Sequence, residues 1–403
     1  MTELRTPGFL QPINAPQMRQ MNRSIILELI RQHGPISRSE ISRALKLSMP
    51  TIMRIVDELV TEGLVRPIGD SKGKTGRPRR LLEYNKGGYL VIGIDLGGTK
   101  LYGALANIGG EILHEAYRPQ HKSMGEQSFE ILCELIESLV CSDGGKDTPI
   151  LGITVGAPGI THARAGIVEW APSLCWREFP LKQRLHERFK LPILVENDVN
   201  LAVLGEQWFG QGKGVNNMVL LAIGTGMGSG LIIDGAIYRG HNESAGEVGY
   251  MISGIKDLGH PNEGFGAMER IVSGTGVVDR ARKVLESQMT KVQIESLTAS
   301  DIFAAARAGE PWAGRIVDET ADYLSMTIIN ISSLLDPELI VLGGGVANSG
   351  DLLIPAIQQR IRGVIPYVPR IEASVLGTRA TVMGAITMTV HTAKDYYVVR
   401  RLN

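Results

Sequence analysis

The sequence of 403 residues is poor in cysteine and aromatic residues and has no long hydrophobic run. Its three cysteines, Cys133, Cys141 and Cys175, have the spacing of neither a metal site nor a disulfide framework, which favours a reducing compartment. No apolar segment approaches the roughly 20 residues of a membrane span, and three prolines interrupt the first 16 residues, where a signal peptide would need an apolar core. We therefore expect a soluble, cytoplasmic protein that does not contact a membrane.

A net charge is also absent, because 42 Lys and Arg residues balance 42 Asp and Glu residues. The balance conceals an asymmetry. Residues 17–84 hold thirteen basic and seven acidic residues, a charge of +6, so the remainder of the chain is acidic. A basic segment on an acidic body suggests that this segment meets a polyanion. With 43% hydrophobic and 21% charged residues, a chain of this length is expected to form two or three globular domains.

Residues 17–84 carry the pattern of a winged helix-turn-helix domain, behind a proline-rich, flexible arm of residues 1–16. Apolar spacing predicts three helices, over residues 17–33, 37–45 and 49–61. Ser37 and Glu40 form a capping box for the second helix, and Ser48 caps the third. In such a domain the third helix enters the major groove of DNA with its first residues leading.

The segment after the third helix has the composition of a wing. Two short apolar strands within residues 64–84 flank a polar turn that ends in the basic run Gly76-Arg77-Pro78-Arg79-Arg80. Arginines of this kind suit a narrow minor groove. The alternative is a trio of packing helices with a solvated basic linker, but the caps and the wing together favour DNA. The expected DNA contacts are Ser48, Met49, Pro50, Thr51, Arg54, Arg77, Arg79 and Arg80.

Beyond residue 88, three buried strands each run into a glycine cluster. The clusters follow strands near residues 89–94, 218–223 and 340–342. Glycine-rich turns of this kind bring backbone N–H groups against phosphates. Their repetition predicts an α/β, actin-like fold of the ribonuclease H and hexokinase type, a two-lobed ATPase fold that clamps a nucleotide. We expect a first lobe of residues 88–200 plus 385–403 and a second lobe of residues 201–384.

A carboxylate pattern lies between the first two glycine clusters. Asn197 and Asp198 follow a strand over residues 193–196, and a helix follows them. A carboxylate at a strand end can accept the proton of a sugar hydroxyl during phosphoryl transfer. The alternative is that Asn197 and Asp198 only cap the following helix, and this motif alone favours that alternative.

Taken together, the motifs resemble the ROK family of bacterial sugar kinases and sugar-responsive repressors. The segments that carry the resemblance are DLGGTK from Asp95, ENDVN from Glu196, GTGMGSG from Gly224, GEVGY from Gly246 and LGGG from Leu342. The resemblance implies a catalytic base at Asp198. It implies phosphate contacts at Asp95, Gly97, Gly98, Thr99, Lys100, Gly224, Thr225, Gly226 and Gly344. It implies sugar contacts at Gly159, Ser173, Asn197, Asp198, Glu247, Tyr250 and Glu269.

Two departures from the family pattern concern the sugar side. Tyr250 stands where the family usually has a histidine that binds sugar and zinc, and residues 259–269 contain no cysteine where a zinc loop is expected. A structural zinc site takes about four N or S ligands, so His260 alone predicts no structural zinc. Ser173 also replaces a frequent asparagine. We expect an altered ligand preference, for a smaller or differently substituted sugar; the alternative is loss of sugar binding.

The expected function is a sugar-responsive transcription repressor whose cleft ligand controls operator binding. It would act as a homodimer or homotetramer on operator DNA, with a sugar or sugar derivative as the ligand. Repression would require no cofactor, although ATP and Mg²⁺ fit the phosphate loops. The chain would then not be primarily an enzyme. The alternatives are an ATP-dependent sugar kinase with a DNA-binding head, and a body that only oligomerises or binds a protein partner.

Overall fold

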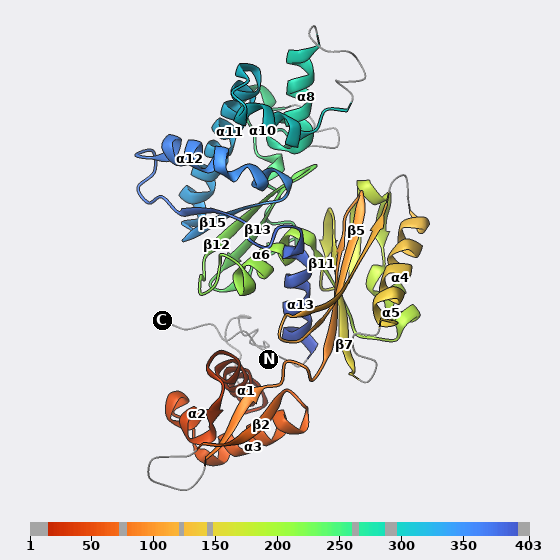
Figure 1. Cartoon of the computed structure of the whole chain (residues 1–403), viewed down its shortest axis with the longest axis vertical. Coiled ribbons are helices and arrows are strands. Elements are labelled where there is room, and N and C mark those ends of the chain that lie inside the picture. Colours follow the sequence, from red (N-terminus) through yellow and green to blue (C-terminus); the bar gives the residue numbers. More distant parts are fainter. Residues whose placement is uncertain are drawn as a thin grey trace, which may run out of the picture.

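The computed structural model describes residues 15–71, 79–120, 125–142, 148–259, 266–286 and 296–393. A small head at the bottom of Figure 1 precedes two larger lobes. The head consists of α1 (Ala15–His33), β1 (Ile36–Ser37), α2 (Arg38–Leu45), α3 (Met49–Thr61), β2 (Val65–Ser71) and β3 (Arg79–Tyr84). The strands form one antiparallel sheet in the order β1-β3-β2.

The helices of the head begin where the sequence places their caps. Ser37 and Glu40 form the predicted capping box of α2, and the Ser48 hydroxyl accepts a hydrogen bond from the Thr51 amide at the start of α3. Helix α1 begins at Ala15, two residues before the expected start. The buried sides of the three helices and the wing share a core of Ile26, Ile30, Ile41, Ile52, Ile55, Leu59 and Leu82.

The first lobe is built on a five-stranded sheet with the order β11-β7-β4-β5-β6. Strand β4 pairs parallel to β7 and antiparallel to β5. The sheet strands are β4 (Leu90–Leu96), β5 (Lys100–Asn107), β6 (Ile112–Pro119), β7 (Ile150–Ala157) and β11 (Ile193–Asn197). The other elements are α4 (Glu126–Val140), α5 (Leu181–Phe189) and a small sheet of β8 (Ile160–His162), β9 (Ile167–Ala171) and β10 (Trp176–Phe179).

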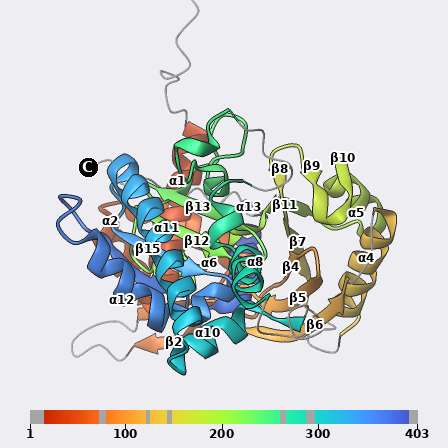
Figure 2. The same ribbon diagram turned by 90° about the horizontal axis from the view of Figure 1, so that it is seen from above.

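The second lobe repeats this plan with a five-stranded sheet in the order β14-β13-β12-β15-β16. Its strands are β12 (Met218–Ile223), β13 (Met227–Ile233), β14 (Ala236–Ile237), β15 (Leu339–Gly343) and β16 (Arg370–Ala373). Its helices are α7 (Glu269–Val272), α8 (Gly274–Leu285), α10 (Ala299–Arg307), α11 (Pro311–Leu335) and α12 (Gly350–Ile361). Viewed from above, the two lobes lie side by side (Figure 2).

Two helices lie between the lobes: α6 (Asp198–Phe209) and α13 (Ala380–Ala393). Their backbones cross in close contact, because a Cβ atom at Gly205 would overlap the Ala380 carbonyl oxygen and one at Gly384 would overlap the Leu201 carbonyl oxygen. Two glycines are therefore needed at this crossing. In Figure 1, α13 runs from between the lobes toward the head.

Candidate ligand cleft and nucleic-acid surface

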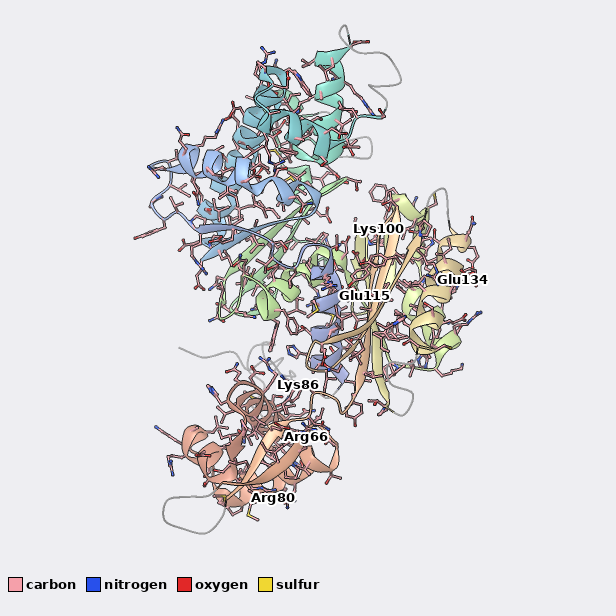
Figure 3. The ribbon with its side chains drawn as sticks, viewed as in Figure 1. Arg66, Arg80, Lys86, Lys100, Glu115 and Glu134 are labelled. Carbon is pink, nitrogen blue, oxygen red and sulfur yellow. The ribbon has the colours of Figure 1, made fainter. Side chains whose placement is uncertain are left out.

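The first phosphate-binding candidate is the turn between β4 and β5. Asp95 is half-buried near the end of β4, whereas Thr99 and Lys100 are exposed. The Gly97 amide donates to the Lys100 carbonyl at 3.1 Å, which closes the hairpin. A Cβ atom at Gly98 would lie 2.6 Å from the Cβ atom of Ser173, so this predicted sugar-side residue packs directly on the turn. Figure 3 shows Lys100 on the side of the first lobe that faces the second.

In the second lobe, the two remaining glycine clusters lie beside each other. Gly224, Thr225 and Gly226 form the turn between β12 and β13, with Thr225 exposed. Gly344 has a φ of +77°, and a Cβ atom there would overlap the carbonyl oxygen of Ile223, the last residue of β12. The structure thus brings Gly344 next to the Gly224 turn, as a shared phosphate site requires.

Asn197 and Asp198 stand at the junction of β11 and α6. The Asn197 side-chain oxygen accepts hydrogen bonds from the amides of Val199 (3.0 Å) and Asn200 (3.1 Å), so the capping role is real. The Asn197 amide nitrogen also donates to the Gly159 carbonyl at 3.1 Å, which joins two predicted sugar contacts. Asp198 accepts from the Val199 amide through one carboxylate oxygen at 2.9 Å. Capping by Asn197 therefore leaves Asp198 available for chemistry.

The remaining predicted sugar contacts come from the second lobe. Glu247 precedes a short 3-10 turn over Val248–Tyr250 that Tyr250 ends, and both residues expose part of their surface. Glu269 begins α7 and accepts hydrogen bonds from the amides of Met227 (3.3 Å) and Gly266 (3.4 Å). Its carboxylate lies against Gly226. Glu269 therefore touches the turn that was predicted to contact phosphate in its own lobe.

The carboxyl groups of the candidate site perturb one another. Burial, with the neighbouring Asp95 charge adding to it, raises the pKa of Asp198 to about 7, and Glu247 contributes in the same direction. Burial also raises the pKa of Asp95 to about 6, although Lys100 opposes this shift. Although Glu247 exposes part of its surface, desolvation of its carboxyl group raises its pKa, and the charge of Glu269 adds to this. A carboxyl group with a pKa near neutrality is suited to act as a general base.

One group that sequence reasoning missed bridges the lobes beside Asn197. Arg239, which follows β14, donates from Nε (2.8 Å) and Nη2 (2.6 Å) to one oxygen of Glu196. The Glu196 side chain is 1% exposed, and its other oxygen accepts from the Asn197 amide and the Asn200 side chain at 3.0 Å each. A buried glutamate at a strand end signals that a cation must approach it, but not which one.

The DNA-reading candidates cluster at the start of α3. Ser48, Met49, Pro50 and Arg54 are exposed, and Met49 exposes 40% of its surface. Thr51 is partly covered, since its hydroxyl lies 2.8 Å from the Ser48 hydroxyl. The opposite side of α3 is buried in the core of the head. Helix α3 therefore presents its first turn outward, as a recognition helix requires.

The wing candidates are only partly described. Arg80 is exposed on β3 and lies toward the end of the head away from the lobes in Figure 3. Arg77 and the side chain of Arg79 lie outside the described residues, as do His260 and the neighbouring residues 261–265.

Among the residues that the structure describes, no group of three or more His, Cys, Asp or Glu side chains could hold a metal ion. Because residues 260–265 are not among them, the expected lack of structural zinc stays a prediction. Over the same described ranges, no helix has the length and apolarity to cross a membrane.

Comparison with known families decides the class of the protein. The model of the ROK family matches residues 91–392. The chain belongs to the ROK family. The model of the MarR family matches residues 21–67, within the head. This ROK protein thus combines the actin-like, two-lobed α/β fold of the family with a winged helix-turn-helix head, as the sequence predicted.

Individual relatives place the chain among the repressors of the family. It is 31% identical to the xylose repressor of Caldicellulosiruptor bescii over 389 residues, which cover 94% of this chain and 97% of the relative. Its structure is similar to that of a ROK family transcriptional regulator, a homologue of the Escherichia coli MLC protein, with a TM-score of 0.82, 26% identity and coverage of 94% and 98%. A ROK glucokinase from Streptomyces griseus, solved with glucose and AMPPNP, matches with a TM-score of 0.65, 28% identity and coverage of 74% and 98%.

Proposed function

We propose that this protein is a sugar-responsive transcription repressor that binds operator DNA through its head. The observation that carries the proposal is the continuous likeness to a xylose repressor and to a ROK regulator over 94% of the chain, head included. The glucokinase covers only 74%, so the head is what separates the two kinds of relative. In the proposed division, residues 17–84 read DNA, and the lobes of residues 88–200 with 385–403 and of residues 201–384 enclose the ligand.

The ligand of the proposed repressor is a sugar or sugar derivative in the interlobe cleft. Asn197, Asp198 and Gly159 supply hydrogen-bonding groups from the first lobe, and Glu247, Tyr250 and Glu269 supply them from the second. The cleft is acidic and partly exposed, which favours a neutral, hydroxyl-rich ligand over an anion. Tyr250 is 41% exposed and replaces the family's histidine, so we propose that it selects a different sugar from the histidine-bearing members.

The operator would be read by a homodimer or homotetramer, since two heads on one palindrome double the number of base contacts. The exposed groups at the start of α3 would meet base edges, and Arg80 with Arg77 and Arg79 would meet the adjacent backbone and minor groove.

Two measurements test this function. Genomic fragments selected by the full chain should bind with an affinity that falls steeply with salt, and Arg54→Ala should weaken binding to the selected site. Thermal unfolding across a sugar panel should identify a ligand that raises Tm, and Asn197→Ala should remove that shift. If the chain, with its head folded, enriched no genomic fragment, the proposed function as a repressor would be wrong.

The pKa of Asp198 favours a second candidate function, an ATP-dependent sugar kinase. A base with a pKa of about 7 can accept a proton from a sugar hydroxyl. The exposed turns at Gly97 and Gly224 would hold the phosphates. Mg²⁺ prefers one or two carboxylates with waters and phosphate oxygens, so Asp95 fits as its protein ligand. ADP release that depends on a sugar, and that Asp198→Asn abolishes, would establish this activity.

A further inference from the structure

Beside the buried apolar cluster that the head shares with α13, the head meets the lobes at a joint made by one cation, two aromatic rings and a cavity. The guanidinium of Arg31 in α1 lies 4.6 Å from the ring centroid of Trp208 in α6. The His391 ring in α13 meets the same indole edge-on at 4.5 Å. Glu28 accepts two hydrogen bonds from Arg31 at 2.7 and 2.8 Å, which holds the guanidinium over the ring.

The cavity leaves this side of the joint loosely packed. It has a volume of about 160 Å³ and is lined by, among others, Arg31, Lys86, Trp208, Phe209 and His391. Figure 3 shows Lys86 between the head and the first lobe. Close-packed interiors resist displacement, whereas a cavity lets neighbouring elements shift without a clash.

The helix that carries Trp208 also carries the ligand groups. Asp198 is the first residue of α6 and Asn197 is its N-cap, so Trp208 lies ten positions after Asp198, about 15 Å along the helix. Within α6, Glu206 accepts from the Ser374 hydroxyl (2.5 Å) and the Leu376 amide (3.2 Å). Helix α6 is thus bonded to the segment that follows β16 of the second lobe.

Helix α13 packs tightly on α6, because their backbones are in contact at Gly205 and Gly384. Helices α6 and α13 therefore form one unit. The candidate sugar site lies at one end of this unit, and the rings of Trp208 and His391 lie against α1 at the other end. The head has a second attachment, where Tyr84 donates to the Ile108 carbonyl (3.2 Å) and Tyr89 to the Glu62 carbonyl (2.8 Å). These bonds lie at the linker and can act as the pivot.

We propose that α6 transmits ligand binding in the cleft to the DNA-reading head, with Trp208 as the positioning residue against which Arg31 sets the orientation of α1. This inference rests on the proposed function. A sugar held by Asn197 and Asp198 shifts α6 together with α13, and Trp208 moves relative to Arg31. The cavity accommodates the shift, and the linker bonds keep the head attached. The coupling is reciprocal, so operator DNA changes sugar affinity by the same factor.

The test measures coupling separately from each binding event. The full chain is titrated with selected operator DNA, with and without saturating D-xylose or D-glucose, and the ratio of the two dissociation constants is the coupling. Trp208→Leu should reduce the coupling at least fivefold, so that the ratio approaches one. Its affinity for the sugar and its affinity for DNA without sugar should each stay within about threefold of wild type. Arg31→Gln should do the same, and the double variant should lose no more. Trp208→Phe should retain part of the coupling, since a smaller ring binds a cation more weakly.

Trp312→Leu, in α11 of the second lobe, is the matched control and should leave the ratio unchanged. If Trp208→Leu kept the full coupling and still bound sugar, the proposed role of the joint would be wrong, but the proposed function as a repressor would not be contradicted. Coupling lost together with sugar affinity would show a merely structural role and would also overturn it. A wild-type chain that binds no sugar of the panel would contradict the proposed function, on which the joint rests, whereas sugar and operator binding without any coupling in the wild type would contradict the joint.

Discussion

The interlobe ion pair between Arg239 and Glu196 allows a quantitative prediction. Replacing Arg239 by Met leaves one oxygen of Glu196 without a donor in a site where its side chain is 1% exposed. Breaking a buried pair costs about 3–5 kcal/mol, and we expect about 3 kcal/mol because the second oxygen keeps both of its donors. For a cooperative body of about 300 residues this lowers Tm by about 5 °C.

Calorimetry on the full chain measures this change, and the structure offers a matched control in a second ion pair between the lobes. Arg164 is 94% exposed and pairs with Glu243 at 3.4 Å, so Arg164→Met should cost less than about 0.5 kcal/mol. Combining Arg239→Met with Glu196→Gln should recover most of the loss, because no charge stays buried. Equal Tm values for Arg239→Met and Arg164→Met would refute the reasoning.

Three further predictions concern the cleft, the wing and the helix crossing. The raised pKa of Asp198 means that its ionisation costs stability as pH rises from about 4 to 7, so Asp198→Asn should exceed wild type in Tm at pH 8 and lose that advantage toward pH 4. Arg80→Ala should reduce the slope of log affinity for DNA against log salt by about one, whereas Arg66→Ala, whose side chain pairs with Glu83 at 2.6 Å, should change it less. Gly384→Ala should destabilise the chain by about 3 kcal/mol or more in calorimetry, because the new methyl group overlaps a backbone oxygen of α6.

Local features of the fold could be predicted from the sequence. The third helix runs over Met49–Thr61 and the strand before the second glycine cluster over Met218–Ile223, as expected, because caps and glycines mark both ends. The pairing of the two-residue strand β1 with β3 was not expected. It depends on how the chain turns after α1, which periodicity does not report.

The candidate site also has parts that the sequence predicts and parts that it does not. Glycine turns and strand-end carboxylates are local signals, and the structure brings Gly98 against Ser173 and Asn197 against Gly159. Whether each named residue contacts a sugar or a phosphate stays a prediction. The partner of Glu196 lies 43 residues away along the chain and in the other lobe, so only the three-dimensional structure identifies Arg239.

The joint was equally inaccessible to sequence reasoning, because Arg31, Trp208 and His391 belong to three helices far apart in the chain. Each residue alone fits an ordinary surface or core position. Their meaning comes from α6, which extends from the cleft to the head.

The most direct test of the account is the affinity of the full chain for its selected operator, measured by fluorescence anisotropy at several salt concentrations with and without a sugar that raises Tm. The account predicts salt-sensitive, specific binding whose dissociation constant changes at least fivefold when the sugar is added, while binding to unrelated DNA does not change. Specific binding that no bound sugar alters, or a sugar that binds without any effect on DNA affinity, would contradict it.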